Sequence, residues 1–225
     1  MLAGDVLVTP RPFFDYQRMF GITAGDLNAG TILDCPSGAS PFAAQVRLRG
    51  GSAVSVDPIY QLSLDEILNL VQTTLNRAPS WLEAEHPQVN RSFFGSPDAL
   101  ARGYQAAADL FTLDYQVNPS AYVNAGLPNL PFEDDEFALT VSSHLLFTDP
   151  QDFVIKSEVD AICEMCRVTI GEVRIHPIVD ARGQSVDAVG ETRAQLEAAS
   201  ISTEIRETGP VSIVGGNKTL VCTKR

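Results

Sequence analysis

The stretch Thr31-Ile-Leu-Asp-Cys-Pro-Ser-Gly-Ala-Ser40 decides the fold, because a short apolar run ends in an acidic residue and continues into a turn of small residues. A helical pattern follows over 41–49 and stops at Gly50-Gly51. A second apolar run, 53–57, again ends in an acid. Strand, helix and strand in this order form a βαβ unit with parallel strands and a right-handed crossover. The sequence therefore predicts an α/β fold.

The rest of the chain continues this alternation. Short β-branched runs predict strands, and longer stretches with helical spacing predict helices between them. The last two strands are joined through Gly215-Gly216-Asn217, which is typical of a hairpin. We therefore expect a Rossmann-like, doubly wound, mostly parallel seven-stranded sheet with an antiparallel C-terminal strand. The further strands are predicted at 121–124, 137–142, 172–177, 202–207 and 218–223, and helices at about 152–168 and 188–199.

Two additions to this scheme are expected. Residues of about 10–22 predict a cap helix before the first strand. Residues of about 63–116 are mostly helical and too long for a simple crossover, and they predict a helical insertion that its prolines should interrupt. With both additions, residues 1–225 are expected to form a single domain. The insertion is expected to form a lid over the substrate; its prolines are Pro79, Pro87 and Pro97, and its lid aromatics are Trp81, Phe93, Phe94 and Tyr104.

Composition and charge limit the partners. The 225 residues include 16 Lys and Arg against 28 Asp and Glu, and this net charge of −12 argues against nucleic-acid binding, which depends on clustered cations. No window approaches the roughly 20 apolar residues of a membrane-spanning helix, and the first residues lack a positive segment before an apolar run. We therefore expect a cytoplasmic protein that binds neither membrane nor nucleic acid. Its oligomeric state stays open.

Neither the cysteines nor the acidic run at 133–136 predicts a metal site. Cys163 and Cys166 form a C-x-x-C pair in a predicted helix, but no second pair and no H-x-x-x-H motif accompanies them. Cys35 and Cys222 are far apart in the sequence. We expect these thiols to be small buried residues, and the acidic run to be a solvated turn.

Ligands of doubly wound sheets bind beyond the carboxyl ends of the strands, so the predicted strand ends are where chemistry is expected. Asp34 ends the first strand, and the turn that follows retains only Gly38 of the three glycines of a dinucleotide loop. Asp57 ends the next strand, where a carboxylate can accept both hydroxyls of a ribose. Each has a structural alternative that needs no ligand. The turn after Asp34 could be a tight strand-to-helix connection, and Asp57 could cap the helix that follows it. Together they predict a nucleoside-bearing ligand.

These motifs, in this order, resemble those of class I S-adenosylmethionine-dependent methyltransferases, and more narrowly a little-characterised bacterial group. The similarity covers about residues 11–225 and is carried by the stretches at 32–40, 54–60 and 127–137, by Ser143-His-Leu-Leu-Phe147 and Glu172-Val-Arg-Ile-His-Pro177, and by the glycines before the last strand. Departures occur as well. Pro36 and Ser40 stand where many relatives have glycine, Ala138 replaces an acid, and the acid usual near Asn124 is missing.

The resemblance implies S-adenosylmethionine as the cofactor and assigns roles along the motifs. Asp34 would support the methionine end, and Asp57 would hold the ribose hydroxyls. The remaining implied cofactor contacts are the turn Cys35, Pro36, Ser37 and Gly38 beneath the methionine end, Pro58 and Ile59 beside the adenine, Asn124, Ala125 and Gly126 at the adenine amine, Ser142, Ser143 and His144 after the fourth strand, and Tyr16 and Arg11 from the cap helix.

The implied function is methyl transfer to a small-molecule acceptor by in-line displacement. His144 is the candidate catalytic residue, since an imidazole with a pKa near 6.5 can act as a general base. The alternative is a ring that packs under the cofactor and bonds to backbone. No role is predicted for His86 or His176. A non-catalytic module that binds S-adenosylmethionine or S-adenosylhomocysteine, or a nicotinamide-dependent oxidoreductase, remains an alternative function.

Overall fold

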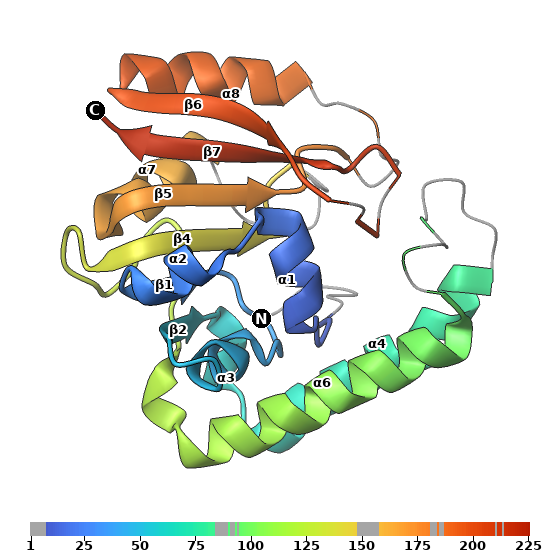
Figure 1. Cartoon of the computed structure of the whole chain (residues 1–225). Coiled ribbons are helices and arrows are strands. Elements are labelled where there is room, and N and C mark those ends of the chain that lie inside the picture. The colour runs from blue at the N-terminus through green and yellow to red at the C-terminus, as the bar shows by residue number, and fades with distance from the viewer. Residues whose placement is uncertain are drawn as a thin grey trace.

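The computed structural model describes residues 8–83, 90, 93, 95–147, 158–180, 184, 187–209, 211–212 and 214–225, with the side chains of 78–83 left aside. These residues form a seven-stranded sheet in the order β3-β2-β1-β4-β5-β7-β6 (Figure 1). β7 is antiparallel to both of its neighbours, and β1 to β5 are mutually parallel. The predicted fold class is confirmed. The strands are β1 (Thr31–Asp34), β2 (Ser52–Val56), β3 (Tyr122–Val123), β4 (Phe137–Ser143), β5 (Thr169–His176), β6 (Ile201–Glu207) and β7 (Lys218–Lys224).

One face of the sheet is covered by helices from the first part of the chain. α1 (Phe13–Phe20) and α3 (Phe42–Arg47) pack aromatic and aliphatic side chains onto Ile32 of β1 and Val141 of β4. The short α2 (Ala24–Asn28) follows α1 and begins with a capping box. Central parallel strands are buried on both faces, which explains why the first strand reads as an unbroken apolar run.

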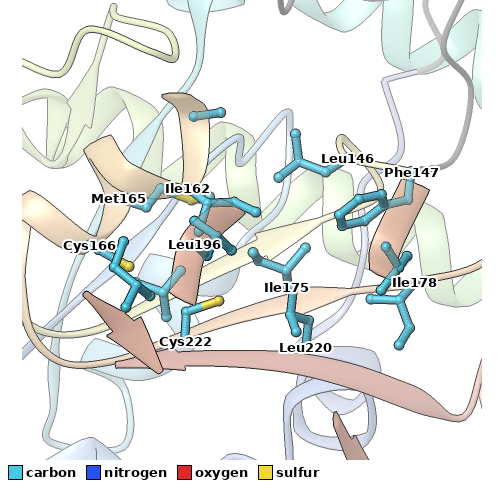
Figure 2. Packing of buried hydrophobic residues seen from close by; sticks show 14 of the residues in the cluster. Leu146, Phe147, Ile162, Met165, Cys166, Ile175, Ile178, Leu196, Leu220 and Cys222 are labelled. Atoms are coloured by element: carbon cyan, nitrogen blue, oxygen red, sulfur yellow. The ribbon is translucent and has the colours of Figure 1, made fainter. Parts of the chain in front are cut away.

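The opposite face is covered by α7 (Glu158–Val168) and α8 (Asp187–Ala198). Their apolar side chains pack against β5 and β7 in one cluster, which Figure 2 shows from close by. Cys166 and Cys222 are part of this cluster, and Cys35 is buried beside Leu33. Cys163 is half-buried. Cys35, Cys166 and Cys222 are therefore small residues of the apolar core.

The insertion consists of two long helices packed side by side, α4 (Leu64–Glu83) and α6 (Pro97–Val117), preceded by η1 (Pro58–Gln61) and followed by η2 (Pro119–Ala121) (Figure 1). The expected break at Pro79 is wrong, because α4 continues through it. A proline inside a helix loses one backbone bond but keeps a helical φ, and packing can compensate for the loss. Pro97, in contrast, occupies the first turn of α6, and the Ser96 side chain caps that helix.

The insertion also contacts the segment between β6 and β7. Asn90 donates hydrogen bonds from its backbone N to Ser212 O at 2.8 Å and from its side chain to Val211 O at 2.9 Å. The Arg18 guanidinium of α1 lies over the Phe93 ring. The insertion, α1 and the segment between β6 and β7 therefore meet at one place. Of the expected lid aromatics, Tyr104 is buried in the core between α4 and α6, while Phe94 and the Trp81 side chain lie outside the described residues.

α1 is fixed to the sheet at its C-terminal end. The buried Arg174 of β5 donates to Phe20 O at 3.0 Å and forms ion pairs with Asp26 and Glu172 at 2.7 Å. Thr219 of β7 donates to Met19 O at 2.6 Å. These bonds hold α1 beside the ends of the central strands. No described helix is both long enough and apolar enough to cross a membrane.

Candidate functional site

The parallel strands all end at one margin of the sheet, here called the carboxyl edge (Figure 1). Segments that are far apart in sequence come together there: the turns after β1, β2 and β3, the ends of β4 and β5, and α1. The insertion packs beside them, because Ile59 and Tyr60 share a core cluster with residues of α4 and α6. The carboxyl edge therefore brings together most of the residues that the sequence singled out.

Asp34, the last residue of β1, is completely buried. Its Oδ2 accepts hydrogen bonds from the Tyr16 hydroxyl at 3.0 Å and from the Ser37 hydroxyl at 2.7 Å. Its Oδ1 has no hydrogen-bond partner among the described residues. Burial raises the pKa of Asp34 to about 8, and the two hydroxyls only partly oppose this rise. A buried oxygen without a partner costs about 1–3 kcal/mol, so Oδ1 marks a place where a donor from outside the chain would be stabilising.

The turn after Asp34 is held by neighbouring strands. Cys35 N donates to Val141 O at 3.0 Å, and Ser37 N donates to Val56 O at 2.9 Å. Gly38 has a φ of +57°, a conformation that glycine adopts without strain. The Cys35 side chain points into the apolar core, so this residue offers the edge only its backbone. Pro36 is half-buried.

Asp57 joins the first two turns. Its Oδ2 accepts from Gly38 N at 2.8 Å, and its Oδ1 accepts from Ile59 N at 2.9 Å and so caps η1. The capping role is therefore present. It leaves each carboxylate oxygen with further lone pairs, which is the capacity that two ribose hydroxyls would need. Burial raises the pKa of Asp57, against the lowering effect of the two backbone bonds.

The residues predicted beside an adenine are brought together by the turns after β2 and β3. Gly126 approaches Pro58 so closely that a Cβ at this position would lie 2.8 Å from Pro58 Cγ. Asn124 is exposed and Ala125 is half-buried. Ile59 packs into the core between α4 and α6, so its side chain presents little surface to the edge.

The end of β4 carries the three polar residues predicted on the acceptor side. The Ser142 hydroxyl is buried and has no partner among the described residues. Because Val141 is the residue paired with Asp34, Ser142 faces the opposite side of the sheet from Asp34. Ser143 Oγ lies 2.8 Å from His144 Nδ1. His144 has a φ of +55°, which is unusual for a residue other than glycine and occurs often at functional sites.

His176 is a residue of this edge that sequence reasoning missed. It is the partner of Ser143 in the β4–β5 register, and its carbonyl accepts a hydrogen bond from His144 N at 2.7 Å. The two imidazole rings lie 5.9 Å apart. Burial, with the charge of Arg11, lowers the pKa of His176 to about 3 and that of His144 well below its usual range. Both histidines are therefore neutral at neutral pH. His176 is the last residue of β5, and the rule that ligands bind beyond the carboxyl ends of strands applies to it as well.

The cap-helix residues Tyr16 and Arg11 also lie at the edge. The Tyr16 ring stacks on Phe42 at 4.5 Å while its hydroxyl reaches Asp34. Arg11 precedes α1, and its carbonyl accepts a hydrogen bond from Ser40 Oγ at 2.9 Å. Two hydrogen bonds, from Tyr16 to Asp34 and from Ser40 to the Arg11 carbonyl, thus join the start of α1 to the turn after β1.

The acidic run at 133–136 is an exposed turn, as expected. Asp134 pairs with Arg167 at 2.7 Å, and Asp135 pairs with Lys224. Within the described ranges, no three His, Cys, Asp or Glu side chains are arranged to hold a metal ion.

No protein-family model matches the chain. An uncharacterised protein of the archaeon Methanocaldococcus jannaschii is 28% identical over 218 residues, which is 96% of each chain. Because this relative is archaeal, it gives no support to the expected restriction to a bacterial group.

Solved structures with a similar course of the chain include three methyltransferases. A SAM-dependent methyltransferase from Aquifex aeolicus is 13% identical with a TM-score of 0.42, covering 86% of this chain and 82% of that one. A TehB-like SAM-dependent methyltransferase from Corynebacterium glutamicum is 15% identical with a TM-score of 0.45, covering 88% and 81%. The 1,6-didemethyltoxoflavin-N1-methyltransferase of Burkholderia thailandensis, solved with 1,6-didemethyltoxoflavin and S-adenosylhomocysteine, is 12% identical with a TM-score of 0.42, covering 85% and 68%.

Proposed function

We propose that this chain is an S-adenosylmethionine-dependent methyltransferase that acts on a small molecule. The observation that carries the proposal is the buried, unpartnered Asp34 Oδ1 at the carboxyl edge, one strand away from a second buried acid, Asp57. A ligand with a cationic group at one end and a ribose at the other would satisfy both acids. S-adenosylmethionine has an ammonium group, a sulfonium group and two ribose hydroxyls.

The residues of the edge fit this ligand in the order in which they lie. Asp34 would accept from the ammonium group, above the turn of Cys35, Pro36, Ser37 and Gly38. Asp57 would accept from the ribose hydroxyls. Pro58, Gly126 and the backbone of Asn124 and Ala125 would surround the adenine. Ser142, Ser143 and His144 would lie on the acceptor side, with Tyr16 and Arg11 closing the site from α1.

The chemistry asks mainly for orientation. Bound at this edge, the cofactor supplies a methyl group on a positively charged sulfur, which is already a good electrophile. The chain has to align an acceptor atom with this methyl group and keep water out, and both requirements favour a site closed by a helix. His144 and His176 are poor bases, because their pKa values are lowered so far. We therefore favour a positioning role for His144 over a general-base role.

A non-catalytic binding module is the second candidate, and the replacement of an acid by Ala138 is a substitution that an inactive relative could carry. Ala138 is the second residue of β4, whereas the carboxyl edge begins at the end of that strand. At about 3.3 Å per residue, five residues separate the two by roughly 16 Å. In this fold, Gly30 and Gly171 both pack closely on Ala138: a Cβ at residue 30 would lie 2.9 Å from Ala138 Cβ, and a Cβ at residue 171 would lie 2.2 Å from Ala138 O. The departure at 138 therefore concerns packing and does not remove a group from the proposed site.

Calorimetric titration of the purified chain with S-adenosylmethionine and with S-adenosylhomocysteine tests the function. We expect micromolar binding of both by the wild type and a loss of about tenfold to hundredfold in Asp57→Asn, which corresponds to about 1.4–2.7 kcal/mol. Asp57→Asn is preferred to Asp57→Ala because it keeps the shape of the side chain and an acceptor for one of the two backbone N–H groups. Glu204→Gln removes an exposed acid of β6 and serves as the matched control. Absence of any binding heat in the folded wild type would overturn the proposal, and binding of NADH instead would favour the oxidoreductase.

A further inference from the structure

Asp15 is an acid in the first turn of α1, and its side chain is only 8% exposed. Among the described residues, no N–H or O–H group donates a hydrogen bond to its carboxylate. Its ion-pair partner is Arg11, whose Nη1 lies 3.9 Å from Asp15 Oδ2, which is longer than a hydrogen bond. An ionised carboxylate has about four lone-pair sites, and buried polar groups are ordinarily hydrogen-bonded. Asp15 can therefore accept a donor that the described part of the chain does not supply.

The position of Asp15 on α1 directs it toward the acceptor side of the carboxyl edge. Residues four apart lie on the same face of a helix, so Asp15 and Met19 share a face of α1. The Met19 sulfur lies 4.0 Å from the Ser143 hydroxyl at the end of β4. Arg11, the partner of Asp15, also lies near this end, because its charge lowers the pKa of His144. Asp15 is thus one helical turn away from the residue of α1 that contacts the acceptor side.

The other titratable and charged groups around α1 and the strand ends are poor proton acceptors at neutral pH. Asp34, with a pKa of about 8, is mostly protonated, and both oxygens of Asp57 already accept backbone N–H groups. Burial raises the pKa of Asp15 to about 6, against the lowering effect of two arginines, so this acid is ionised at pH 7 and still basic enough to take a proton. The remaining groups are protonated cations, a tyrosine with a raised pKa, or histidines with lowered pKa values: Arg11, Arg18, Tyr104, His144 and His176.

We propose that Asp15 is the general base of the methyl transfer and that the methyl acceptor is a hydroxyl compound. The inference rests on the proposed function and adds a catalytic residue and a substrate class. An amine can attack with its free lone pair and lose its proton afterwards, whereas a hydroxyl is a weak nucleophile until its proton is removed. A buried, ionised carboxylate without a hydrogen bond is therefore most useful to an O–H acceptor.

The step balances with the groups at hand. A lone pair of the acceptor oxygen forms the bond to the methyl carbon, and the electron pair of the breaking carbon–sulfur bond returns to sulfur, which becomes a neutral sulfide. The O–H proton passes to an Asp15 oxygen, so the carboxylate becomes a carboxylic acid and later releases the proton to water. Arg11 stabilises the ionised form of Asp15 that must be present before the reaction.

The first experiment measures by NMR the binding of phenol, and of anisole, which lacks the O–H proton, to protein saturated with S-adenosylhomocysteine. At pH 7 the wild type should bind phenol about tenfold to hundredfold more tightly than anisole, because ionised Asp15 accepts the O–H group. This preference should fall at pH 5, where Asp15 is protonated and Asp34 is protonated as before. Asp15→Asn cannot ionise, so its preference should be smaller and equal at the two pH values. Asp109→Asn removes an exposed acid of α6 and should behave like the wild type.

The second experiment incubates the protein with S-adenosylmethionine and phenol and measures anisole and S-adenosylhomocysteine by mass spectrometry. The wild type should form the two products in equal amounts, at a rate that rises between pH 5 and pH 7 as Asp15 ionises. Asp15→Asn should lower kcat by about hundredfold or more, while calorimetry shows an unchanged Kd for S-adenosylmethionine. Asp15→Glu should restore part of the rate and its pH dependence.

Equal affinities of the wild type for phenol and anisole at pH 7, or no binding of either, overturn the role of Asp15, and this comparison needs no variant to fold. A phenol preference that is the same at pH 5 and pH 7, or anisole formation that Asp15→Asn retains in full, overturns it as well. If phenol is bound but not methylated, the binding experiment decides. A wild type that does not bind S-adenosylhomocysteine refutes the proposed function instead.

Discussion

The two buried acids of the carboxyl edge, Asp34 and Asp57, end neighbouring parallel strands but have different surroundings. Both Asp57 oxygens accept backbone N–H groups, so this carboxylate is bonded before any ligand arrives. Asp34 accepts two hydroxyls on one oxygen and leaves the other without a partner. The region around Asp57 is therefore complete as protein structure. The region around Asp34 is complete only with a donor from outside.

The largest expected effect tests whether Asp34 is held protonated. Its pKa is about 8 in the folded chain against 3.8 unfolded, so between these pH values the folded state binds one proton more. The free energy of unfolding then falls as pH rises from 4 to 8, by up to about 1.4 kcal/mol per pH unit, and levels off above. Asp34→Asn cannot ionise and lacks this fall. Urea unfolding of both proteins at pH 4, 6 and 8 measures it. A variant-minus-wild-type difference that does not grow with pH would contradict the assignment.

The next effect concerns the two N–H groups that Asp57 accepts. Asp57→Ala leaves Gly38 N and Ile59 N without their acceptor, and each buried loss costs about 1–3 kcal/mol. We expect the free energy of unfolding at pH 7 to fall by about 2–6 kcal/mol. Asp34→Ala should lower the free energy of unfolding by less at this pH. It also removes a buried oxygen that has no partner among the described residues, and a carboxyl group whose pKa is raised by burial. If Asp34→Ala and Asp57→Ala lower the free energy of unfolding equally, hydrogen bonding does not distinguish the surroundings of Asp34 from those of Asp57.

Much of this edge could be predicted from sequence, because the relevant signals are local. Apolar runs ending at residues 34 and 57 identify buried parallel strands, and the topology of such sheets brings their ends to one side. The short strand at 122–123 and the polar residues at the end of β4 follow from the same rule. Local pattern therefore located the acids and the turns.

What could not be predicted depends on which segments become neighbours. His176 reaches His144 only because β5 pairs with β4 in a register that sets Ser143 opposite His176. The periodicity of apolar residues predicts that a residue is buried, but it does not predict which segment that residue packs against. The contact of Tyr16 with Asp34 likewise requires α1 to fold back over the edge, where Arg174 and Thr219 hold it. The break expected at Pro79 is wrong as well, because α4 continues through that residue.

The smallest effect compares two buried serines that differ as the two acids do. Ser55 Oγ lies 3.0 Å from Ser37 Oγ, whereas Ser142 Oγ has no partner among the described residues. Removing a partnered hydroxyl loses a hydrogen bond, while removing an unpartnered one relieves a desolvation cost. We therefore expect Ser55→Ala to lower the free energy of unfolding by about 1 kcal/mol and Ser142→Ala to leave it unchanged or raise it by up to about 1 kcal/mol. The order should reverse for binding: calorimetry should show weaker S-adenosylmethionine binding by Ser142→Ala and unchanged binding by Ser55→Ala. If Ser142→Ala is instead the less stable variant and binds S-adenosylmethionine normally, the Ser142 hydroxyl already has a partner in the free chain. Asp34 would then be the group at this edge that needs a ligand as its hydrogen-bond partner.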